Sequence, residues 1–199
     1  LCQLYEALSQ DRAAELPEPE LQYADFAAWE RQWLDNGVRE SEMAYWMQHL
    51  KGVPAATDLP TDRQRPAVQR FHGARVPIIF STARLGALRA LAKRTQTSLF
   101  MVVAAAWQAL MHRYSAQSTV VTGTVVANRD RRELERVVGY FANTLALRTD
   151  FDSTLTVAGL LAQVKATALS AYEHQHLPFE EIVEALKLPR DTSRMPLIQ

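Results

Sequence analysis

The sequence predicts a mixed α/β fold of the α+β kind, in which helices cover a mixed β-sheet. Residues 119–129 are rich in β-branched side chains and carry no charge before Arg129, which is typical of a strand buried on both faces. Residues 138–148 repeat apolar side chains with the two-residue period of a second strand. Apolar residues at helical spacing flank both segments. These patterns together predict helices packed against a sheet.

The first fifty residues are expected to be mainly helical. Residues 1–9 have the pattern of the inside of a helix, with no capping residue in front of them. Residues 21–34 place aromatic side chains at three-residue steps, and Asn36 and Gly37 form a C-terminal cap signal. Residues 40–50 predict a further helix, and we expect it to pair with the one before.

The middle of the chain is expected to cross onto the sheet. Residues 55–73 are polar and interrupted by prolines, which indicates a long loop. Residues 75–80 predict a strand that Pro77 restricts to a sheet edge. Helices follow at 82–93 and 98–114, and the second is apolar all round, as a helix between two layers would be. The order strand, helix, helix, strand makes a crossover, right-handed by default if the two strands are parallel.

The last part of the chain predicts two more helices. Residues 156–172 have an apolar stripe at helical spacing. Pro178 occupies the first turn of a short helix over 179–186, where Glu180 and Glu181 are favourable near the positive end of the helix dipole. The remaining residues carry no helix or strand pattern.

Composition excludes several classes of protein. The chain has 199 residues and is 48% hydrophobic, which is enough for a core. It has 22 Lys plus Arg and 22 Asp plus Glu, so its charge gives no sign of nucleic acid or membrane binding. Cys2 is the single cysteine, which excludes an intrachain disulfide and fits a reducing, cytoplasmic location. No signal peptide pattern is present, and the uncharged stretch 95–112 contains an apolar core of only about 13 residues, which is too short to span a bilayer.

Few residues offer an obvious chemistry. The sequence has no glycine-rich phosphate loop, nucleophile elbow or zinc-protease motif. His174 and His176 are close in sequence, but no carboxylate or cysteine cluster accompanies them, so we expect no metal site and a hydrogen-bonding role for His174. The charged run from 129 to 136 alternates in sign, which favours a solvated face over an anion site. Asn143 interrupts an apolar row and is either a satisfied structural amide or a site residue.

Four successive segments of the chain, residues 23–29, 138–148, 174–180 and 190–197, carry motifs that resemble those of a known family. They are similar to the signature motifs of the condensation domains of nonribosomal peptide synthetases, and residues 59–63 and 123–129 extend the likeness. Val125 departs from it, because the family usually has proline there. The motif residues are Tyr23, Asp25 and Trp29; Gly123 and Asn128; Gly139, Asn143, Thr144 and Arg148; His174, Pro178, Phe179 and Glu180; and Arg190, Ser193, Arg194, Pro196 and Leu197.

This resemblance implies a two-lobed fold like that of chloramphenicol acetyltransferase, represented mainly by its later half. Residues 1–58 would belong to the N-terminal lobe, 59–73 to a crossover loop and 74–199 to the C-terminal lobe. The implied reaction forms an amide between a thioester on a donor carrier protein and the amine on an acceptor carrier protein. The partners would be both carrier domains and a neighbouring adenylation domain. Phosphopantetheine would be carried by those partners, and this chain itself would bind no cofactor.

The family chemistry centres on a His-His-x-x-x-Asp-Gly motif that this sequence does not contain. The resemblance places that motif upstream of Leu1 and further elements of the second lobe beyond Gln199, so we assign no catalytic residue within the chain. Arg129 would pair with the aspartate of the motif, and Asn143 would hold the thioester or the amine close to the reaction centre. We do not assign His174 as a base.

The resemblance leaves several functions open. The sequences of the motifs at 138–148 and 190–197 resemble those of the subtype that joins two L-configured residues. Alternatives are an inactive lobe with a structural or interaction role, which would expose unpaired strand edges and self-associate, and an acyltransferase of the same fold that uses coenzyme A.

Overall fold

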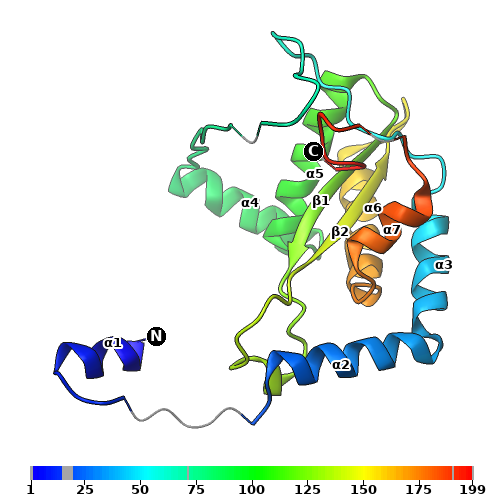
Figure 1. The fold of residues 1–199 in the computed structure, drawn as a ribbon. Helices are drawn as coiled ribbons and strands as arrows, with labels where there is room; N and C mark the ends of the chain where they lie inside the picture. Colours follow the sequence, from blue (N-terminus) through cyan, green and yellow to red (C-terminus); the bar gives the residue numbers. More distant parts are fainter. Residues whose placement is uncertain (1, 15–19, 71, 190, 199) are drawn as a thin grey trace.

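The computed structural model describes residues 2–14, 20–70, 72–189 and 191–198, so Arg190 lies outside the described residues (Figure 1). The mixed helix and sheet class is confirmed. In chain order the elements are α1 (Cys2–Ser9), α2 (Tyr23–Trp33), a π-helical turn η1 (Leu34–Val38), α3 (Arg39–His49), α4 (Thr82–Arg94), α5 (Leu99–Ser115), β1 (Thr119–Val126), a 3-10 turn η2 (Arg132–Leu134), β2 (Asn143–Asp150), α6 (Val157–Glu173) and α7 (Phe179–Leu186).

Helices α2 and α3 are joined by a kink at the predicted cap. Gly37 has φ of +93°, in the left-handed region that favours glycine, and this residue interrupts the helical backbone inside η1. The long axes of α2 and α3 therefore point in different directions in Figure 1. As a result, α2 packs on the loop after β1, while α3 packs against α7.

Short polar side chains define where the later helices begin. The Ser98 hydroxyl accepts a hydrogen bond from the Met101 amide at 3.1 Å, and the Thr156 hydroxyl accepts one from the Gly159 amide at 3.1 Å. Each bond satisfies one of the amides that a helix leaves without a partner in its first turn.

No helix in the described part of the chain is long and apolar enough to cross a membrane.

The sheet consists of β1 and β2, paired antiparallel from Thr119 opposite Asp150 to Val126 opposite Asn143. The strand predicted at 75–80 is wrong: this segment has no regular structure, and its Val76 side chain is 85% exposed. Its local composition is that of a strand, but no described strand pairs with it. The crossover predicted between that segment and β1 is therefore absent as well.

The ends of both strands differ from prediction. β2 begins at Asn143, so Phe141 precedes the strand and packs elsewhere. β1 is buried at Val120 and Val121, but Val125 is exposed. Burial on both faces thus holds only for the first half of β1.

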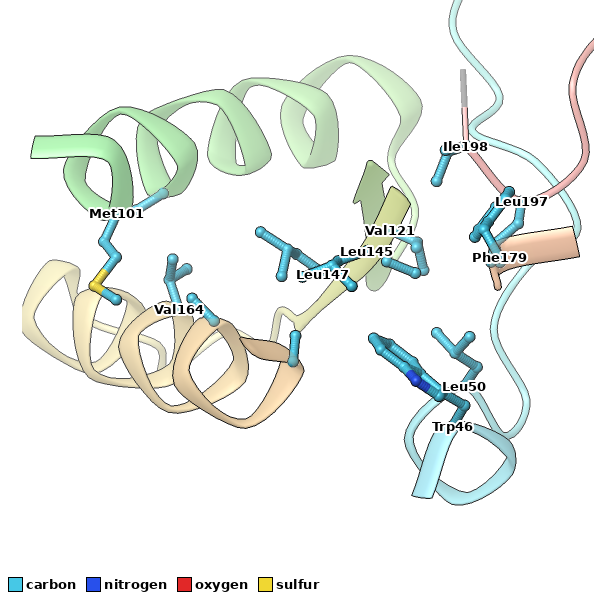
Figure 2. Close-up of a cluster of buried hydrophobic side chains, with 14 of the residues drawn as sticks. Trp46, Leu50, Met101, Val121, Leu145, Leu147, Val164, Phe179, Leu197 and Ile198 are labelled. Atoms are coloured by element: carbon cyan, nitrogen blue, oxygen red, sulfur yellow. The ribbon is translucent and has the colours of Figure 1, made fainter. Parts of the chain in front are cut away.

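The main core fills both faces of the sheet. α5 and α6 lie on one face, and α3, α7 and the C-terminal segment lie on the other (Figure 2). Buried side chains from all these elements form one cluster, which includes Trp46, Leu145, Val164 and Leu197. The helix α5 was expected between two layers, but only one of its faces is buried, and Phe100, Val103 and Trp107 on the other face are exposed.

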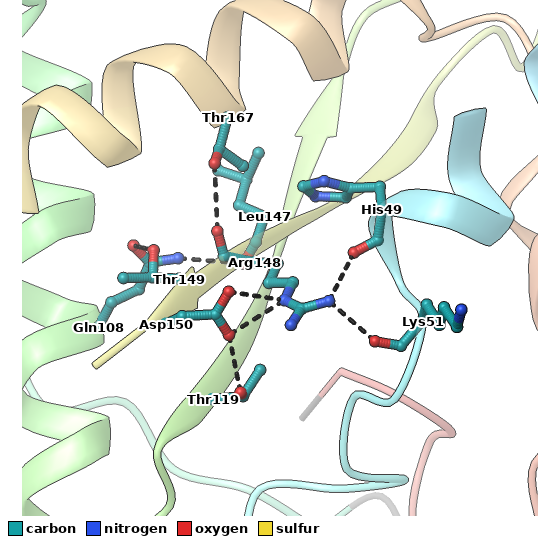
Figure 3. Close-up of polar contacts among 9 residues, drawn as sticks. All are labelled: His49, Lys51, Gln108, Thr119, Leu147, Arg148, Thr149, Asp150 and Thr167. Atoms are coloured by element: carbon teal, nitrogen blue, oxygen red, sulfur yellow. Dashed lines mark hydrogen bonds and ion pairs between the residues drawn. The ribbon is translucent and has the colours of Figure 1, made fainter. Parts of the chain in front are cut away.

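A buried amide joins α5 to the sheet. Gln108 is 0% exposed, and its Nε2 donates to the Leu147 carbonyl and the Thr122 hydroxyl, both at 3.0 Å. Its Oε1 accepts from the Thr149 hydroxyl at 2.8 Å (Figure 3). Because buried polar groups are costly without partners, these three bonds fix the register of α5 on both strands.

Candidate functional site

Asn143 stands at the first residue of β2 and reaches into the turn before α7. Its Nδ2 donates to the Gln175 carbonyl at 2.7 Å and to the Leu177 carbonyl at 2.8 Å. Its Oδ1 accepts from the amides of Thr144 at 2.8 Å and Phe179 at 3.1 Å. Both amide protons and both lone pairs of the side chain are therefore engaged by backbone groups. This geometry is that of a satisfied structural amide.

The contact with Phe179 also explains how α7 begins. Pro178 precedes that helix and offers no side-chain cap, so the first amides of α7 need another acceptor. Asn143 Oδ1 supplies it from a neighbouring element. The side chain of Asn143 thus connects the motif at 138–148 to the motif at 174–180.

Arg129 organises the loop between the strands. Its guanidinium donates to the carbonyls of Leu134, Val137 and Gly139, the last two at 2.9 and 3.4 Å. Its Cζ also lies 3.9 Å from the centre of the Phe141 ring. None of the ion pairs found among the described residues involves Arg129. Its partners here are carbonyls, where the resemblance implied a carboxylate.

The first motif packs on this same loop. The Tyr23 hydroxyl donates to the Tyr140 carbonyl at 2.7 Å, and its ring meets Phe141 edge-on at 5.2 Å. Asp25 accepts from the Gln22 amide at 2.8 Å at the start of α2. Trp29 lies under the Arg131 guanidinium at 4.3 Å. The motif of α2 therefore braces the loop that Arg129 holds.

Gly139 allows this close packing. A Cβ at this position would lie 2.1 Å from Cδ2 and 2.6 Å from Cγ of Tyr23, both near the rigid base of the ring. We expect Gly139→Ala to lower the free energy of unfolding by about 1–3 kcal/mol, as overpacking does. Denaturant titration measures this loss.

The matched control is Gly86→Ala in α4, where an added Cβ meets nothing within 4 Å. It should raise stability by about 0.5–1 kcal/mol, because alanine favours a helix interior. If the steric account of Gly139 is right, Gly139→Ala costs much less in a Tyr23→Ala background. An equal cost in both backgrounds would contradict it.

A cavity of about 160 Å³ lies beside Asn143. Its lining includes Glu30 from α2, Asn128 from the loop after β1, His176 from the turn before α7 and Glu180 from the first turn of α7. Burial raises the pKa of the Glu30 carboxyl above its ordinary value. Asn128 is buried with φ of +49°, and its Oδ1 has no hydrogen-bond partner among the described residues. The cavity is where side chains from three motif segments meet.

No group of three or more potential metal ligands occurs among residues 2–14, 20–70, 72–189 and 191–198. His176 Nε2 is 3.7 Å from Asp130 Oδ2, and the ring meets Trp33 edge-on at 5.0 Å. His174 is the C-cap residue that follows α6, and its Nδ1 is 2.9 Å from Glu42 Oε1. Both histidines thus have protein partners.

Arg148 links the sheet to the end of α3. Its Nε donates to both Asp150 carboxylate oxygens at 3.1 Å, and its Nη1 donates to the carbonyls of His49 and Lys51 at 3.0 and 2.9 Å (Figure 3). Burial, and secondarily the Arg148 charge, lowers the pKa of His49. This motif residue therefore has a structural role away from the cavity.

The lowered pKa of His49 predicts a pH dependence of stability. The unfolded chain takes up a proton on His49 as pH falls below about 6.5, while the folded chain does so only at lower pH. The contribution of His49 to the free energy of unfolding is therefore fully present above about pH 6.5. It is lost as pH falls toward the pKa of His49 in the folded chain, by at most about 1.4 kcal/mol per pH unit.

His49→Phe keeps an aromatic ring beside Tyr45, which stacks on His49 at 5.5 Å. We expect this variant to have a shallower decline in unfolding free energy between about pH 6.5 and 5. Denaturant titrations at several pH values measure the slope. Equal slopes in the two proteins would refute the assignment to His49.

The last motif contacts the segment after α3 and the middle of β1. Asp191 accepts from the Ser193 amide at 2.8 Å and pairs with Arg194 at 2.6 Å. The Leu197 amide donates to the Ala55 carbonyl at 3.0 Å, and the Leu197 side chain is buried. Ile198 packs over Gly123, where a Cβ would lie 2.5 Å from Ile198 Cδ1. These contacts anchor the C-terminal segment on β1 and on the segment after α3.

The structure thus brings part of the motif set together. The motif residues that line the cavity come from the loop after β1, the start of β2 and the start of α7, and α2 contributes Phe26 and Glu30 to the lining. The cavity lining does not include Tyr23, Asp25, Trp29, Arg148, Gly123 or the described residues of the last motif. Sequence reasoning missed Glu42 and Glu30. Glu42 could have been found from its place on the same helical face as Tyr45 and Trp46.

Comparison with known proteins identifies relatives over the whole chain. The family model described as the condensation domain matches residues 1–199. One of the linear gramicidin synthase proteins of Brevibacillus parabrevis is 48% identical over 199 residues, which are 100% of this chain and 3% of that protein. Malpinin synthetase of Mortierella alpina is 42% identical over 199 residues, again 100% of this chain and 3% of that protein. This chain therefore spans a small part of these relatives.

Solved structures give the same result. The X-domain from teicoplanin biosynthesis has a TM-score of 0.90 and 32% identity, over 99% of this chain and 45% of that chain. The same X-domain in complex with OxyB has a TM-score of 0.88 and 33% identity, over 98% and 44% of the two chains. Holo-AB3403, a four-domain nonribosomal peptide synthetase bound to AMP and glycine, has a TM-score of 0.77 and 33% identity, over 79% and 12%.

Proposed function

The chain belongs to the condensation-domain family of nonribosomal peptide synthetases, and from this premise we propose that it takes part in amide bond formation. The proposed reaction transfers an acyl or peptidyl group from a phosphopantetheine thioester on a donor carrier protein. The acceptor is the amine of an aminoacyl thioester on a second carrier protein. The sequences of the motifs at 138–148 and 190–197 support two L-configured substrates. A neighbouring adenylation domain would load the acceptor carrier protein with its amino acid.

One observation carries this proposal. Segments that are more than a hundred residues apart in sequence, α2 and the turn before α7, meet with the start of β2 around one small polar cavity. Attack of an amine on a thioester requires that both reactants be held in one orientation, that a proton be removed and that an oxyanion be stabilised. A cavity assembled from rigid elements suits the first of these needs.

The described residues have positioning roles in this proposal. Arg129 fixes the loop from 130 to 141 through carbonyls, and its charge would also attract the aspartate of a His-His-x-x-x-Asp-Gly segment. Asn143 fixes the start of α7, with no donor or acceptor left for a substrate. The catalytic histidine would come from outside the 199 residues.

A reconstituted condensation assay tests the proposal. Donor and acceptor aminoacyl carrier proteins are mixed with the 199-residue chain, and separately with a length of the encoded protein that includes the His-His-x-x-x-Asp-Gly segment. Intact mass spectrometry detects the dipeptidyl carrier. We expect product only from the longer protein. A variant of the longer protein, in which the second histidine of His-His-x-x-x-Asp-Gly is changed to alanine, should give none.

Two outcomes would overturn this assignment. Product from the 199 residues alone would place the catalytic group among His49, His72, His112, His174 and His176. Equal turnover when acyl-coenzyme A replaces the donor carrier would instead favour an acyltransferase that does not need carrier proteins.

A docking role is a second candidate function. It is favoured by the X-domain from teicoplanin biosynthesis, which resembles this chain closely and has been solved in complex with OxyB. The longer protein would then make no dipeptide but would bind OxyB, the protein found in that complex. Isothermal titration calorimetry with purified OxyB, run alongside the condensation assay, separates the two functions.

A further inference from the structure

One face of α3 holds His174 at three points. Glu42, Tyr45 and Trp46 occupy positions i, i+3 and i+4, so they lie together on the helix. Glu42 Oε1 is 2.9 Å from His174 Nδ1, and Trp46 Nε1 donates to the His174 carbonyl at 2.9 Å. The Tyr45 ring stacks on the imidazole with centroids 3.8 Å apart. Both the ring and the backbone of His174 are thereby fixed relative to α3.

Glu42 is an unusual residue for a purely structural contact. It is 6% exposed, and its Oε2 is buried with no hydrogen-bond partner among the described residues. A buried carboxylate needs a partner of opposite charge or a strong donor. Arg39, one turn earlier on α3, is already engaged by Asp35 and Glu181. Among the described residues, His174 Nδ1 is therefore the polar atom that contacts the Glu42 carboxyl group.

The residues after His174 connect this pair to the cavity. The carbonyls of Gln175 and Leu177 accept hydrogen bonds from the two side-chain amide protons of Asn143. The Phe179 backbone amide donates a hydrogen bond to Asn143 Oδ1. The turn from 174 to 178 thus lies between α3 on one side and the start of β2 on the other. Any movement of His174 would move the carbonyls that orient Asn143.

We propose that Glu42 is a positioning residue that acts through His174. The Glu42 to His174 contact fixes the turn from 174 to 178, and the turn in turn fixes Asn143 and the wall of the cavity formed by His176 and Pro178. Its effect on catalysis rests on the proposed condensation function. Its effect on the orientation of Asn143 does not.

The structural part is tested by NMR on the 199-residue chain. The two side-chain amide protons of Asn143 should give separate signals with slow solvent exchange, because both are hydrogen-bonded. We expect Glu42→Leu and His174→Phe to speed this exchange about tenfold or more. Glu42→Gln and His174→Asn should stay within about twofold of wild type, because each retains a hydrogen-bonding atom near the original position.

A matched control separates positioning from loss of stability. Val164→Ala removes two buried methyl groups from α6, and Val164 takes no part in the hydrogen bonds or the ring stack that hold His174. It should lower the unfolding midpoint while leaving the Asn143 signals unchanged. If Val164→Ala changes those signals as much as His174→Phe does, the proposal is wrong. His174→Phe, with the Tyr45 stack kept, replaces Glu42→Leu if that variant does not fold.

The catalytic part is tested in the longer protein. Glu42→Leu is expected to lower kcat about 10- to 100-fold with little change in KM for the acceptor carrier, since a small misplacement near a reaction centre has effects of this size. Glu42→Gln should recover most of the rate. An active wild type with an unaffected Glu42→Leu would overturn this inference alone. An inactive wild type would overturn the proposed function, and the Asn143 exchange would still decide the role of Glu42.

Discussion

Replacing Asn143 with alanine is expected to lower the free energy of unfolding by about 2–4 kcal/mol. The substitution removes four hydrogen bonds at once, and it leaves the carbonyls of Gln175 and Leu177 and the amide of Phe179 without their partner. Each buried group left unsatisfied costs about 1–3 kcal/mol, and partial access of water to this site reduces the sum. Denaturant titration with an unchanged m-value would measure the loss.

The matched control for Asn143 is Asn128→Gly. Asn128 is a buried amide in the same cavity wall, but its Oδ1 has no partner among the described residues and its φ of +49° suits glycine. We expect this control to cost under about 1 kcal/mol. An Asn143→Ala protein of wild-type stability, whose longer form nevertheless lost condensation activity, would show that the amide contacts substrate and is not mainly a clamp.

Gln108→Leu is expected to have an effect of similar size, about 2–4 kcal/mol, at a site remote from the cavity. Leucine fits the volume, but the Thr149 hydroxyl, which is fully buried, loses its acceptor, and the Leu147 carbonyl loses a donor. The penalty is that of leaving these groups buried and unpaired. Thermal or denaturant unfolding of the two proteins measures it.

A double variant isolates the cause. Thr149→Val removes the hydroxyl that Gln108→Leu leaves without an acceptor, so the pair should cost at least about 1 kcal/mol less than the sum of the single changes. Additive costs would contradict the network account, and would assign the loss to packing of α5 on the strands.

Sequence reasoning succeeded where the physical cause was local. Helix starts were predictable because Ser98 and Thr156 satisfy amides only three residues away. Gly37 was predicted to end a helix, because few residues other than glycine adopt a left-handed backbone readily, and the structure has a kink at this residue. The class of the fold followed from such local signals and is confirmed.

It failed where the cause lay far away in the chain. Residues 75–80 have a strand pattern, yet a strand exists only if another segment pairs with it, and local composition does not encode that partner. The partners of Asn143 are backbone carbonyls from 175 and 177, which have no side-chain signature. The same holds for Arg129, whose contacts are carbonyls within its own loop.

Asn143 shows how far the candidate site could be predicted. Its apolar surroundings indicated that it must be either satisfied or functional, and the structure supplies four partners. Glu42 was not found at all, because a single glutamate within an amphipathic helix is normally read as a solvent-facing residue. Only its position among Tyr45 and Trp46 distinguished it.

The separation of Glu42 and His174 in the chain, 132 residues, has a kinetic consequence. The elements α5, β1, β2 and α6 follow one another closely in the chain, so their contacts close short loops and can form early in folding. In contrast, α3 must dock across a long loop, and closing that loop costs more conformational entropy. We therefore expect α3 to dock late in folding, and we expect its undocking to cost less free energy than global unfolding. The turn that orients Asn143 would loosen during each such opening, so the lifetime of the docked α3 limits how long the cavity wall stays ordered.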